Sequence, residues 1–145
     1  MNLNSEIPAA ARSEATLECS ADQALAMACE GAACLIDIRQ TFELELKGAL
    51  PGALHVPFFN FKQHLGLDLD EEEQEILDAD APSELDMRQF VGNIEQLEQR
   101  RDATLLLVCN SGRRSLIAAH LLRGIGYPRV YSVRGGMHAL PDKAP

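Results

Sequence analysis

The stretch TLLLVCNSGRRSLIAAHLLR, residues 104–123, decides the fold of this chain. Its first five residues, 104–108, form the most apolar run in the sequence and predict a buried central strand. The run SLIAAHLLR at 115–123 predicts a helix, which Gly124 and Gly126 end. The residues between them, CNSGRR at 109–114, therefore form a short loop that leads from a buried strand directly into a helix.

The rest of the chain repeats this alternation of strands and helices. Short runs of branched apolar residues predict strands, and a capping-box pattern at Ser20 and Gln23 marks the start of one helix. Strands are expected at 34–38, 53–56 and 129–133, and helices at 21–30, at 42–47 and from 83 to about 101. The pattern indicates an α/β fold with a central, mainly parallel sheet flanked by helices.

A length of 145 residues predicts a single domain with one active site. Residues 1–15 lack apolar periodicity and are expected to be a flexible N-terminal arm, so the domain spans 16–145. Within the domain, residues 68–82 are acidic and hold few apolar side chains, which predicts a surface insertion formed by a solvated loop or a mobile helix. A solubilising role and a docking role toward a basic partner protein are both open for this segment.

The net charge of −9 argues against nucleic acid or an anionic membrane as a partner. The chain holds no run of 18 or more apolar residues and no secretory type of N-terminus, so a cytoplasmic location is expected. Of the 22 acidic residues, 21 precede Ala103, whereas residues 103–141 hold five arginines and no acidic residue. That segment is suited to attract an anion.

Cys109 lies where ligands bind in an open α/β sheet, at the carboxyl end of a strand and just before a helix. The residues predicted to bind an anion beside it are Asn110, Ser111, Gly112, Arg113, Arg114 and Ser115. Inward-pointing amides and two guanidinium groups would favour the thiolate of Cys109, although a lone cysteine at such a place is more often a small buried hydrophobe. A thiolate there can attack the outer sulfur of an anionic donor such as thiosulfate. The resulting persulfide would then pass its sulfur to cyanide or to a thiol.

These features resemble the rhodanese family along nearly the whole chain. The loop CNSGRRS (109–115) is similar to the active-site loop of that family, and DIR (37–39) is similar to its Asp-x-Arg segment. GALPGALHVP (48–57) resembles the family's Gly-His-Ile-Pro-Gly-Ala segment, and Gly135-Gly136 resembles the Gly-Gly turn after its last strand. The resemblance implies a three-layer rhodanese-type fold and a thiosulfate sulfurtransferase that carries sulfur on Cys109 without a cofactor.

The chain departs from the family pattern at three places. Ala49 replaces a usual histidine, Asn110 stands where a basic residue is common, and residues 137–140 lack a usual tryptophan. None of these changes removes Cys109, but Asn110 removes a positive charge from the loop. The physiological sulfur donor and acceptor therefore stay open, and a sulfur-relay protein is one of the partners to consider.

Two other kinds of function remain as alternatives. The first is a non-catalytic or regulatory module that binds a protein. The second is phosphatase or arsenate reductase chemistry, which also uses a thiolate in an anion loop. Related phosphatases have a Cys-x5-Arg loop, which is one residue longer, whereas here position 115 is Ser.

Several other side chains receive structural interpretations. Asp37 and Arg39 are expected either to pair with each other or to present Arg39 to the substrate, and Glu43 is expected to join their polar support. His55 is interpreted as a structural histidine, and Arg134 as a residue at the border of the site.

The remaining cysteines and histidines predict no further chemistry. Cys34 is expected in the core, and Cys19 and Cys29 as inert surface or helix residues, although a mobile one could resolve the persulfide. The four histidines, His55, His64, His120 and His138, do not cluster with cysteines or carboxylates, so no metal site is expected.

Overall fold

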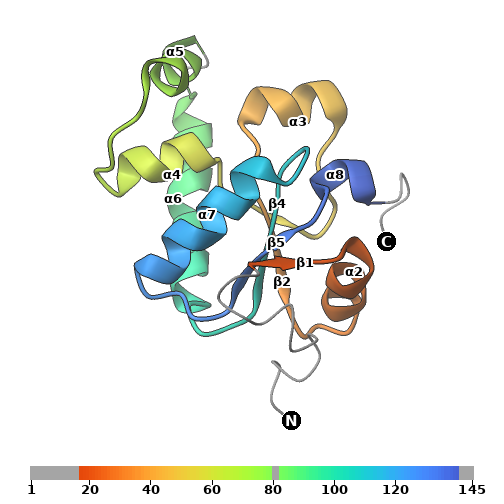
Figure 1. The fold of residues 1–145 in the computed structure, drawn as a ribbon. Coiled ribbons are helices and arrows are strands. Elements are labelled where there is room, and N and C mark those ends of the chain that lie inside the picture. The colour runs from red at the N-terminus through yellow and green to blue at the C-terminus, as the bar shows by residue number, and fades with distance from the viewer. Residues whose placement is uncertain (1–16, 80–81, 141–145) are drawn as a thin grey trace.

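The computed structural model describes residues 17–79 and 82–140, and its centre is a fully parallel five-stranded sheet (Figure 1). The strand order is β1-β5-β4-β2-β3, which places the apolar strand β4 in the middle. The strands are β1 (Glu18–Cys19), β2 (Cys34–Asp37), β3 (Leu54–His55), β4 (Leu105–Val108) and β5 (Val130–Val133). In β4 and β5 every residue is buried, as expected for central strands that are covered on both faces.

Seven helices in the described part of the chain flank this sheet. They are α2 (Ala21–Cys29), α3 (Thr41–Lys47), α4 (Phe58–His64), α5 (Glu71–Ala79), α6 (Glu84–Gln99), α7 (Arg113–Gly124) and α8 (Gly136–Ala139). The predicted fold class, an α/β sheet between helical layers, is confirmed.

Side chains of β4 alternate between two hydrophobic cores, one on each face of the sheet. Leu105 and Leu107 pack in the core that holds buried residues of α4, α6 and α7. Leu106 and Val108 pack in the second core, with buried residues of α2 and with Leu140 after α8. Helices therefore pack on both faces of the sheet, which gives the domain three layers.

Local sequence signals start two of the helices. The Ser20 hydroxyl accepts a hydrogen bond from the amide of Gln23 at 3.1 Å, and the Gln23 side chain bonds back to the Ser20 amide, which completes the predicted capping box. Ser83 caps α6 in the same way through Asp86. These contacts satisfy amide groups that have no partner inside the helix.

The sequence did not predict three of the elements. The strand β1 has only two residues and is defined by pairing with β5, where Glu18 lies opposite Ser132. Helix α4 buries Phe58, Phe59 and Phe61, and α8 is a single short turn after Gly135.

The acidic segment is partly helical, because residues Glu71–Ala79 form α5, which packs against α4 through the Lys62–Glu73 ion pair at 3.0 Å. Its interpretation as an insertion stays a prediction. The N-terminal arm predicted at 1–15 lies outside the described residues. Within the described ranges, the structure contains no helix with both the length and the apolar character needed to cross a membrane.

Candidate active site

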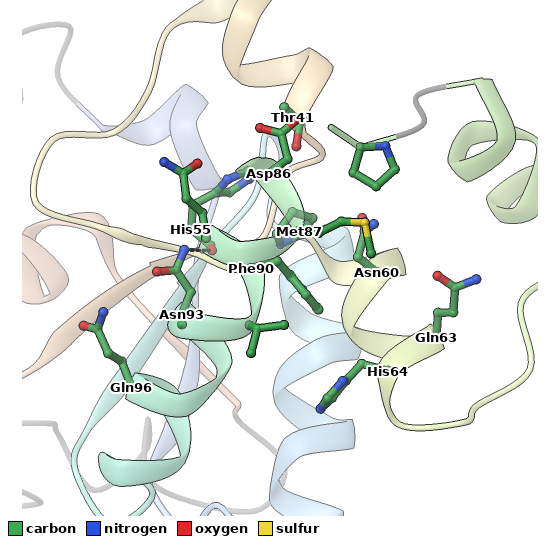
Figure 2. Close-up of a pocket in the computed structure, with 15 residues that line it drawn as sticks. Thr41, His55, Asn60, Gln63, His64, Asp86, Met87, Phe90, Asn93 and Gln96 are labelled. Atoms are coloured by element: carbon green, nitrogen blue, oxygen red, sulfur yellow. Dashed lines mark hydrogen bonds between the residues drawn. The ribbon is translucent and has the colours of Figure 1, made fainter. Parts of the chain in front are cut away.

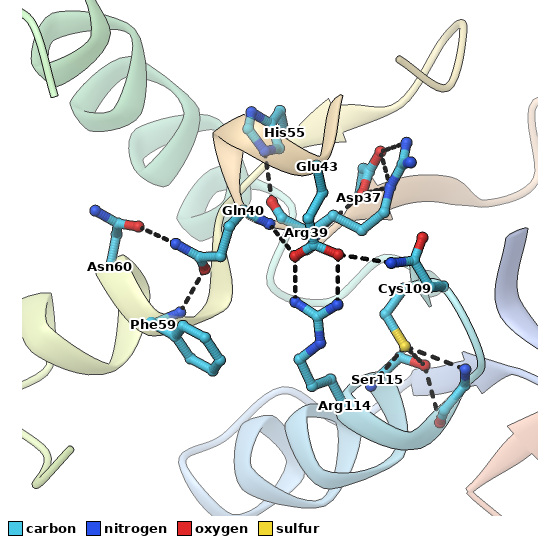
Figure 3. Close-up of polar contacts among 12 residues, drawn as sticks. Asp37, Arg39, Gln40, Glu43, His55, Phe59, Asn60, Cys109, Arg114 and Ser115 are labelled. Carbon is cyan, nitrogen blue, oxygen red and sulfur yellow. Dashed lines mark hydrogen bonds and ion pairs between the residues drawn. The ribbon is translucent and has the colours of Figure 1, made fainter. Parts of the chain in front are cut away.

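Cys109 directly follows β4 at the carboxyl edge of the sheet, and its side chain is the centre of a small polar cluster (Figure 3). The residue is only 1% exposed. Its Sγ atom accepts hydrogen bonds from the backbone amide of Gly112 at 3.2 Å and from that of Ser115 at 3.4 Å. Two amide dipoles of the loop therefore point at the sulfur, which is the arrangement that stabilises an anion.

The loop can curl around the sulfur because Gly112 adopts a left-handed conformation with a φ of 94°. A side chain disfavours this conformation. Gly112 is also the N-cap of α7, so the positive end of that helix dipole faces the Cys109 thiol.

Two buried serines extend the polar contacts of Cys109. Ser115 Oγ lies 3.4 Å from Cys109 Sγ and 2.6 Å from Ser132 Oγ, and Ser132 belongs to β5. Both serines are fully buried. The Cys109 thiol donates to Ser115 Oγ, and the Ser115 hydroxyl donates to the carbonyl oxygen of Gly112 at 3.2 Å. When the thiol is ionised, the Ser115 hydroxyl can turn to the sulfur and Ser132 can donate to Ser115, so the pair can stabilise negative charge on Sγ.

The glycine turn after β5 holds the loop from the other side. The amide of Met137 donates to the carbonyl oxygen of Cys109 at 2.8 Å, and that of His138 donates to the carbonyl of Asn110 at 3.2 Å. A Cβ atom on Gly136 would lie 2.1 Å from the carbonyl oxygen of Cys109. The glycine is required here because the two backbone segments approach too closely for any side chain.

Glu43 on α3 joins two residues of the loop. Its carboxylate accepts two hydrogen bonds from the guanidinium of Arg114, both at 2.7 Å, and one from the Asn110 side-chain amide at 2.6 Å. Burial favours a raised pKa for Glu43, but the hydrogen bonds from Arg114 and from the Gln40 backbone outweigh it and lower the pKa below its usual value. The charge of Arg114 is therefore compensated inside the protein.

This position of Glu43 corrects the expectation that it supports Asp37 and Arg39. Those two residues form their own pair, with Arg39 Nη2 at 2.8 Å from Asp37 Oδ2 and with Arg39 fully buried. Arg39 also donates to the carbonyl of Gly48 at 3.0 Å, so it ties the loop after β2 to the end of α3. Of the two roles considered for Arg39, these contacts favour the structural one.

Other predicted residues lie farther from the sulfur. Ser111 and Arg113 are exposed on the loop and at the start of α7. His55 Nε2 lies 2.7 Å from the carbonyl oxygen of Arg39, in agreement with a structural role. The side chain of Arg134 is 59% exposed and pairs with Glu18 at 3.7 Å, so it is directed to β1.

The other three cysteines do not join the cluster. Cys19, expected at the surface or in a helix, is instead buried in β1, and burial raises the pKa of its thiol to about 11.

Cys34 begins β2 opposite Leu105, at the amino edge of the sheet, and Cys29 ends the helix before it. Four residues of β-strand separate that edge from Cys109, a distance of about 13 Å. Cys34 is half-buried rather than fully in the core, and Arg100 donates to its sulfur at 3.3 Å.

Two contacts of the site were not predicted from the sequence. Glu43 and Arg114 are 71 positions apart, and Ser115 and Ser132 are 17 apart. The acid-free segment 103–141 already indicated that a carboxylate bound to Arg114 must come from elsewhere in the chain, but not which one. In the ranges 17–79 and 82–140, no cluster of three or more histidine, cysteine or carboxylate side chains is arranged to hold a metal ion.

Fold and site together define a parallel α/β domain with a cysteine held in an amide loop at the carboxyl edge of its sheet. The chain belongs to the rhodanese-like domain family, whose sequence pattern matches residues 20–142. A search of curated proteins found no match.

Solved structures show the same fold at low sequence identity. The human single-domain sulfurtransferase TSTD1 is 22% identical, with a TM-score of 0.56 over 86% of this chain and 94% of that one. The single-domain sulfurtransferase RDL2 of Saccharomyces cerevisiae is 20% identical, with a TM-score of 0.51 over 83% of this chain and 85% of that one. A Rhodopseudomonas palustris protein of unknown function, described as a possible tyrosine phosphatase, is 22% identical, with a TM-score of 0.52 over 94% of this chain and 81% of that one.

Proposed function

We propose that this chain is a sulfurtransferase that carries sulfane sulfur as a persulfide on Cys109. The observation that carries the proposal is the pair of amide hydrogen bonds from Gly112 and Ser115 to Sγ. Groups that stabilise a thiolate also stabilise the negative terminal sulfur of a persulfide, because both are sulfur anions at the same loop. Membership of the rhodanese-like family and the two sulfurtransferases among the similar structures agree with this assignment.

The reaction has two balanced steps. In the first, the Cys109 thiolate attacks the outer sulfur of thiosulfate, the sulfur–sulfur bond of the donor breaks, and sulfite leaves with the bonding electron pair. In the second, cyanide or a thiolate attacks the terminal sulfur of the persulfide, and the Cys109 thiolate is restored as that bond breaks. Neither step needs an external oxidant, a reductant or a metal.

The arrangement of Arg114 bears on the choice of donor. Its guanidinium is bound to Glu43 through two hydrogen bonds of 2.7 Å, so its positive charge is already neutralised. The exposed Arg113 and the loop amides remain to attract an anion. We infer that thiosulfate binds weakly, and that a donor or acceptor with less charge, such as a persulfide or a thiol, suits the loop better. We expect this exchange in the cytoplasm, where thiols stay reduced.

Phosphatase and arsenate reductase chemistry are less well supported. A phosphate surrounded by the loop would need the arginine for its oxygens, and here Arg114 is committed to Glu43. A phenyl phosphate ester should therefore not be hydrolysed.

The experiment that tests the proposal is an intact-mass measurement after incubation with thiosulfate and removal of the excess. The wild-type protein should gain about 32 Da, the mass of one sulfur atom in a persulfide, and lose it on addition of cyanide. A Cys109→Ser variant should gain nothing, and a Cys34→Ser variant should load like the wild type. If thiosulfate and a small-molecule persulfide both fail to load a protein whose Cys109 alkylates readily, the proposed reaction is wrong.

A further inference from the structure

A groove of about 700 Å³ lies outside the active site, between α4 and α6 (Figure 2). Asn60, Gln63 and His64 form its wall on α4, and residues between Asp86 and Gln96 form its wall on α6. Thr41 and His55, which lie near the carboxyl edge of the sheet, also line it. No role in the chemistry at Cys109 explains this groove.

Helix α6 presents apolar side chains to the groove. Met87 and Val91, one turn apart, are 56% and 52% exposed, and Phe90 beside them is half-buried. Ile94 and Leu97, farther along the same side of α6, are buried in the core, and Phe90 packs against that core. The apolar stripe of α6 therefore continues beyond the core toward the start of the helix, where Met87 and Val91 stay largely uncovered by the described part of the chain.

Gly92 widens this groove without serving the packing of the chain. It lies inside α6, where glycine is unfavourable, and a Cβ atom at this position would meet nothing within 4 Å. Neither a close approach nor a left-handed conformation within the chain requires a glycine there. A ligand that approaches the helix closely is a physical reason for the absence of a side chain.

The surroundings of the groove are strongly acidic. Between positions 58 and 96 the sequence holds eleven carboxylates but only two basic residues, Lys62 and Arg88. Both are already paired, Lys62 with Glu73 at 3.0 Å and Arg88 with Glu84 at 2.9 Å. The unpaired carboxylates on and around α5 therefore give this face a negative field that favours a cationic partner.

The groove also approaches the catalytic loop through a chain of hydrogen bonds (Figure 3). Asn60, on the wall of the groove, accepts from the side-chain amide of Gln40 at 2.9 Å. The backbone amide of Gln40 donates to Glu43 at 3.0 Å, and Glu43 binds Arg114. A molecule in the groove would lie beside the edge of the sheet where Cys109 is placed.

We propose that this groove binds a basic amphipathic helix of a partner protein. The apolar face of that helix packs on Met87, Phe90 and Val91, and its lysines and arginines face the carboxylates of α5 and Asp86. A second copy of this chain is disfavoured as the occupant, because its matching face would bring carboxylates against carboxylates. Sulfur exchange between this partner and Cys109 rests on the proposed function. Binding of the partner in the groove does not depend on it.

The test uses a fluorescent peptide of about 18 residues, or five helical turns, built from leucine and lysine with one apolar face. Binding to the full chain is measured by fluorescence anisotropy, and a scrambled peptide of equal composition lacks the apolar face. The double variant Met87→Lys with Val91→Lys blocks the groove. Leu46→Lys with Ile117→Lys is its matched control, since it adds the same charge at side chains that are 78% and 63% exposed elsewhere.

The wild type is expected to bind the amphipathic peptide with a Kd of about 10 μM, and the groove variant at least about tenfold more weakly. The control variant should bind the amphipathic peptide with the same Kd as the wild type. The scrambled peptide should bind the wild type at least about tenfold more weakly than the amphipathic one. Glu71→Gln with Glu72→Gln should weaken binding more than Glu95→Gln with Glu98→Gln on the far half of α6.

Four outcomes would overturn the proposal: no binding at about 1 mM peptide, equal binding of the scrambled peptide, equal losses in the groove and control variants, or a dimer that the groove variant dissociates. The last would make a second copy of the chain the occupant. Sulfur loading of Cys109 is measured on the same samples and should not change. Peptide binding without any loading would contradict the proposed function and leave the groove inference intact.

Discussion

The carboxylate of Glu43 binds the guanidinium of Arg114 through two hydrogen bonds of 2.7 Å, although the two residues are 71 positions apart. The contact ties α3 to the start of α7, and through Asn110 it also holds the residue next to Cys109. Arg114 thus stabilises the loop by a contact inside the protein, which leaves the amides of Gly112 and Ser115 and the Ser115 hydroxyl as the groups that contact the sulfur.

Replacement of Glu43 by Gln should destabilise the protein and should do so in a pH-dependent way. The hydrogen bonds from Arg114 overcome the effect of burial and lower the pKa of Glu43 in the folded state. The carboxylate therefore contributes stability that is fully present above its unfolded pKa of about 4.3 and is lost as the pH falls through the lower folded pKa. The stability difference between wild type and Glu43→Gln should be about 1–3 kcal/mol at neutral pH, because the variant leaves Arg114 partly buried without its charge partner.

Urea unfolding of both proteins at about pH 7 and about pH 3 measures this difference. The difference in the free energy of unfolding between the wild type and Glu43→Gln should be smaller at the lower pH. A gap that is equally large at both would mean that the ionised carboxylate is not its cause.

Replacement of Ser132 by Ala should slow the reaction of Cys109 near neutral pH. Ser132 lies 2.6 Å from Ser115, which in turn lies 3.4 Å from the sulfur, so its loss weakens the hydrogen bond that Ser115 can offer to the thiolate. One neutral hydrogen bond is worth about 1 kcal/mol, or roughly fivefold in rate. Alkylation of Cys109 by iodoacetamide at about pH 7, followed by peptide mass analysis, should show this loss, whereas the alkylation rate of the exposed Cys29 in the same sample should not change. An unchanged rate at Cys109 would show that the serine pair does not act on the sulfur.

Replacement of Gly136 by Ala should disrupt the active-site loop. The new Cβ would lie 2.1 Å from the carbonyl oxygen of Cys109, and that atom belongs to the backbone and cannot rotate away. We expect a loss of about 2–4 kcal/mol in stability or a displaced loop with little sulfur loading.

Gly92→Ala is the matched control, because the same methyl group meets open space on α6. It should raise stability by about 0.5–1 kcal/mol through better helix propensity. The unfolding temperatures of the two variants should shift in opposite directions from the wild type, and persulfide loading should fall only in Gly136→Ala. If Gly136→Ala is as stable and as active as Gly92→Ala, the close approach of the two backbone segments is not essential.

Cys19 should stay unmodified under conditions that label the surface thiols. It is 1% exposed, and burial raises the pKa of its thiol to about 11. Cys29 is exposed and should react with iodoacetamide at neutral pH, whereas Cys19 should react only after unfolding or near its raised pKa. Peptide mass analysis of native and urea-unfolded samples measures this contrast. Rapid native labelling of Cys19 would show that β1 detaches from β5 in solution.

By itself the sequence determined the features that arise from neighbouring residues. The apolar run at 104–108, the glycines after 123 and the capping box at Ser20 each act within a few positions, so the strand–loop–helix unit and the place of Cys109 could be predicted. The loop motif around Cys109 also indicated the family, and that family is confirmed.

Only the tertiary structure decided which distant side chains meet. Strand β1 has two residues and exists because β5 supplies its hydrogen-bond partners, and burial of Cys19 follows from that pairing. The partners of Arg114 and Ser115 come from α3 and β5, and the groove beside α6 needs α4 as its second wall. Such contacts depend on how the chain packs across the sheet, and local periodicity holds no information about distances between segments that are far apart along the chain.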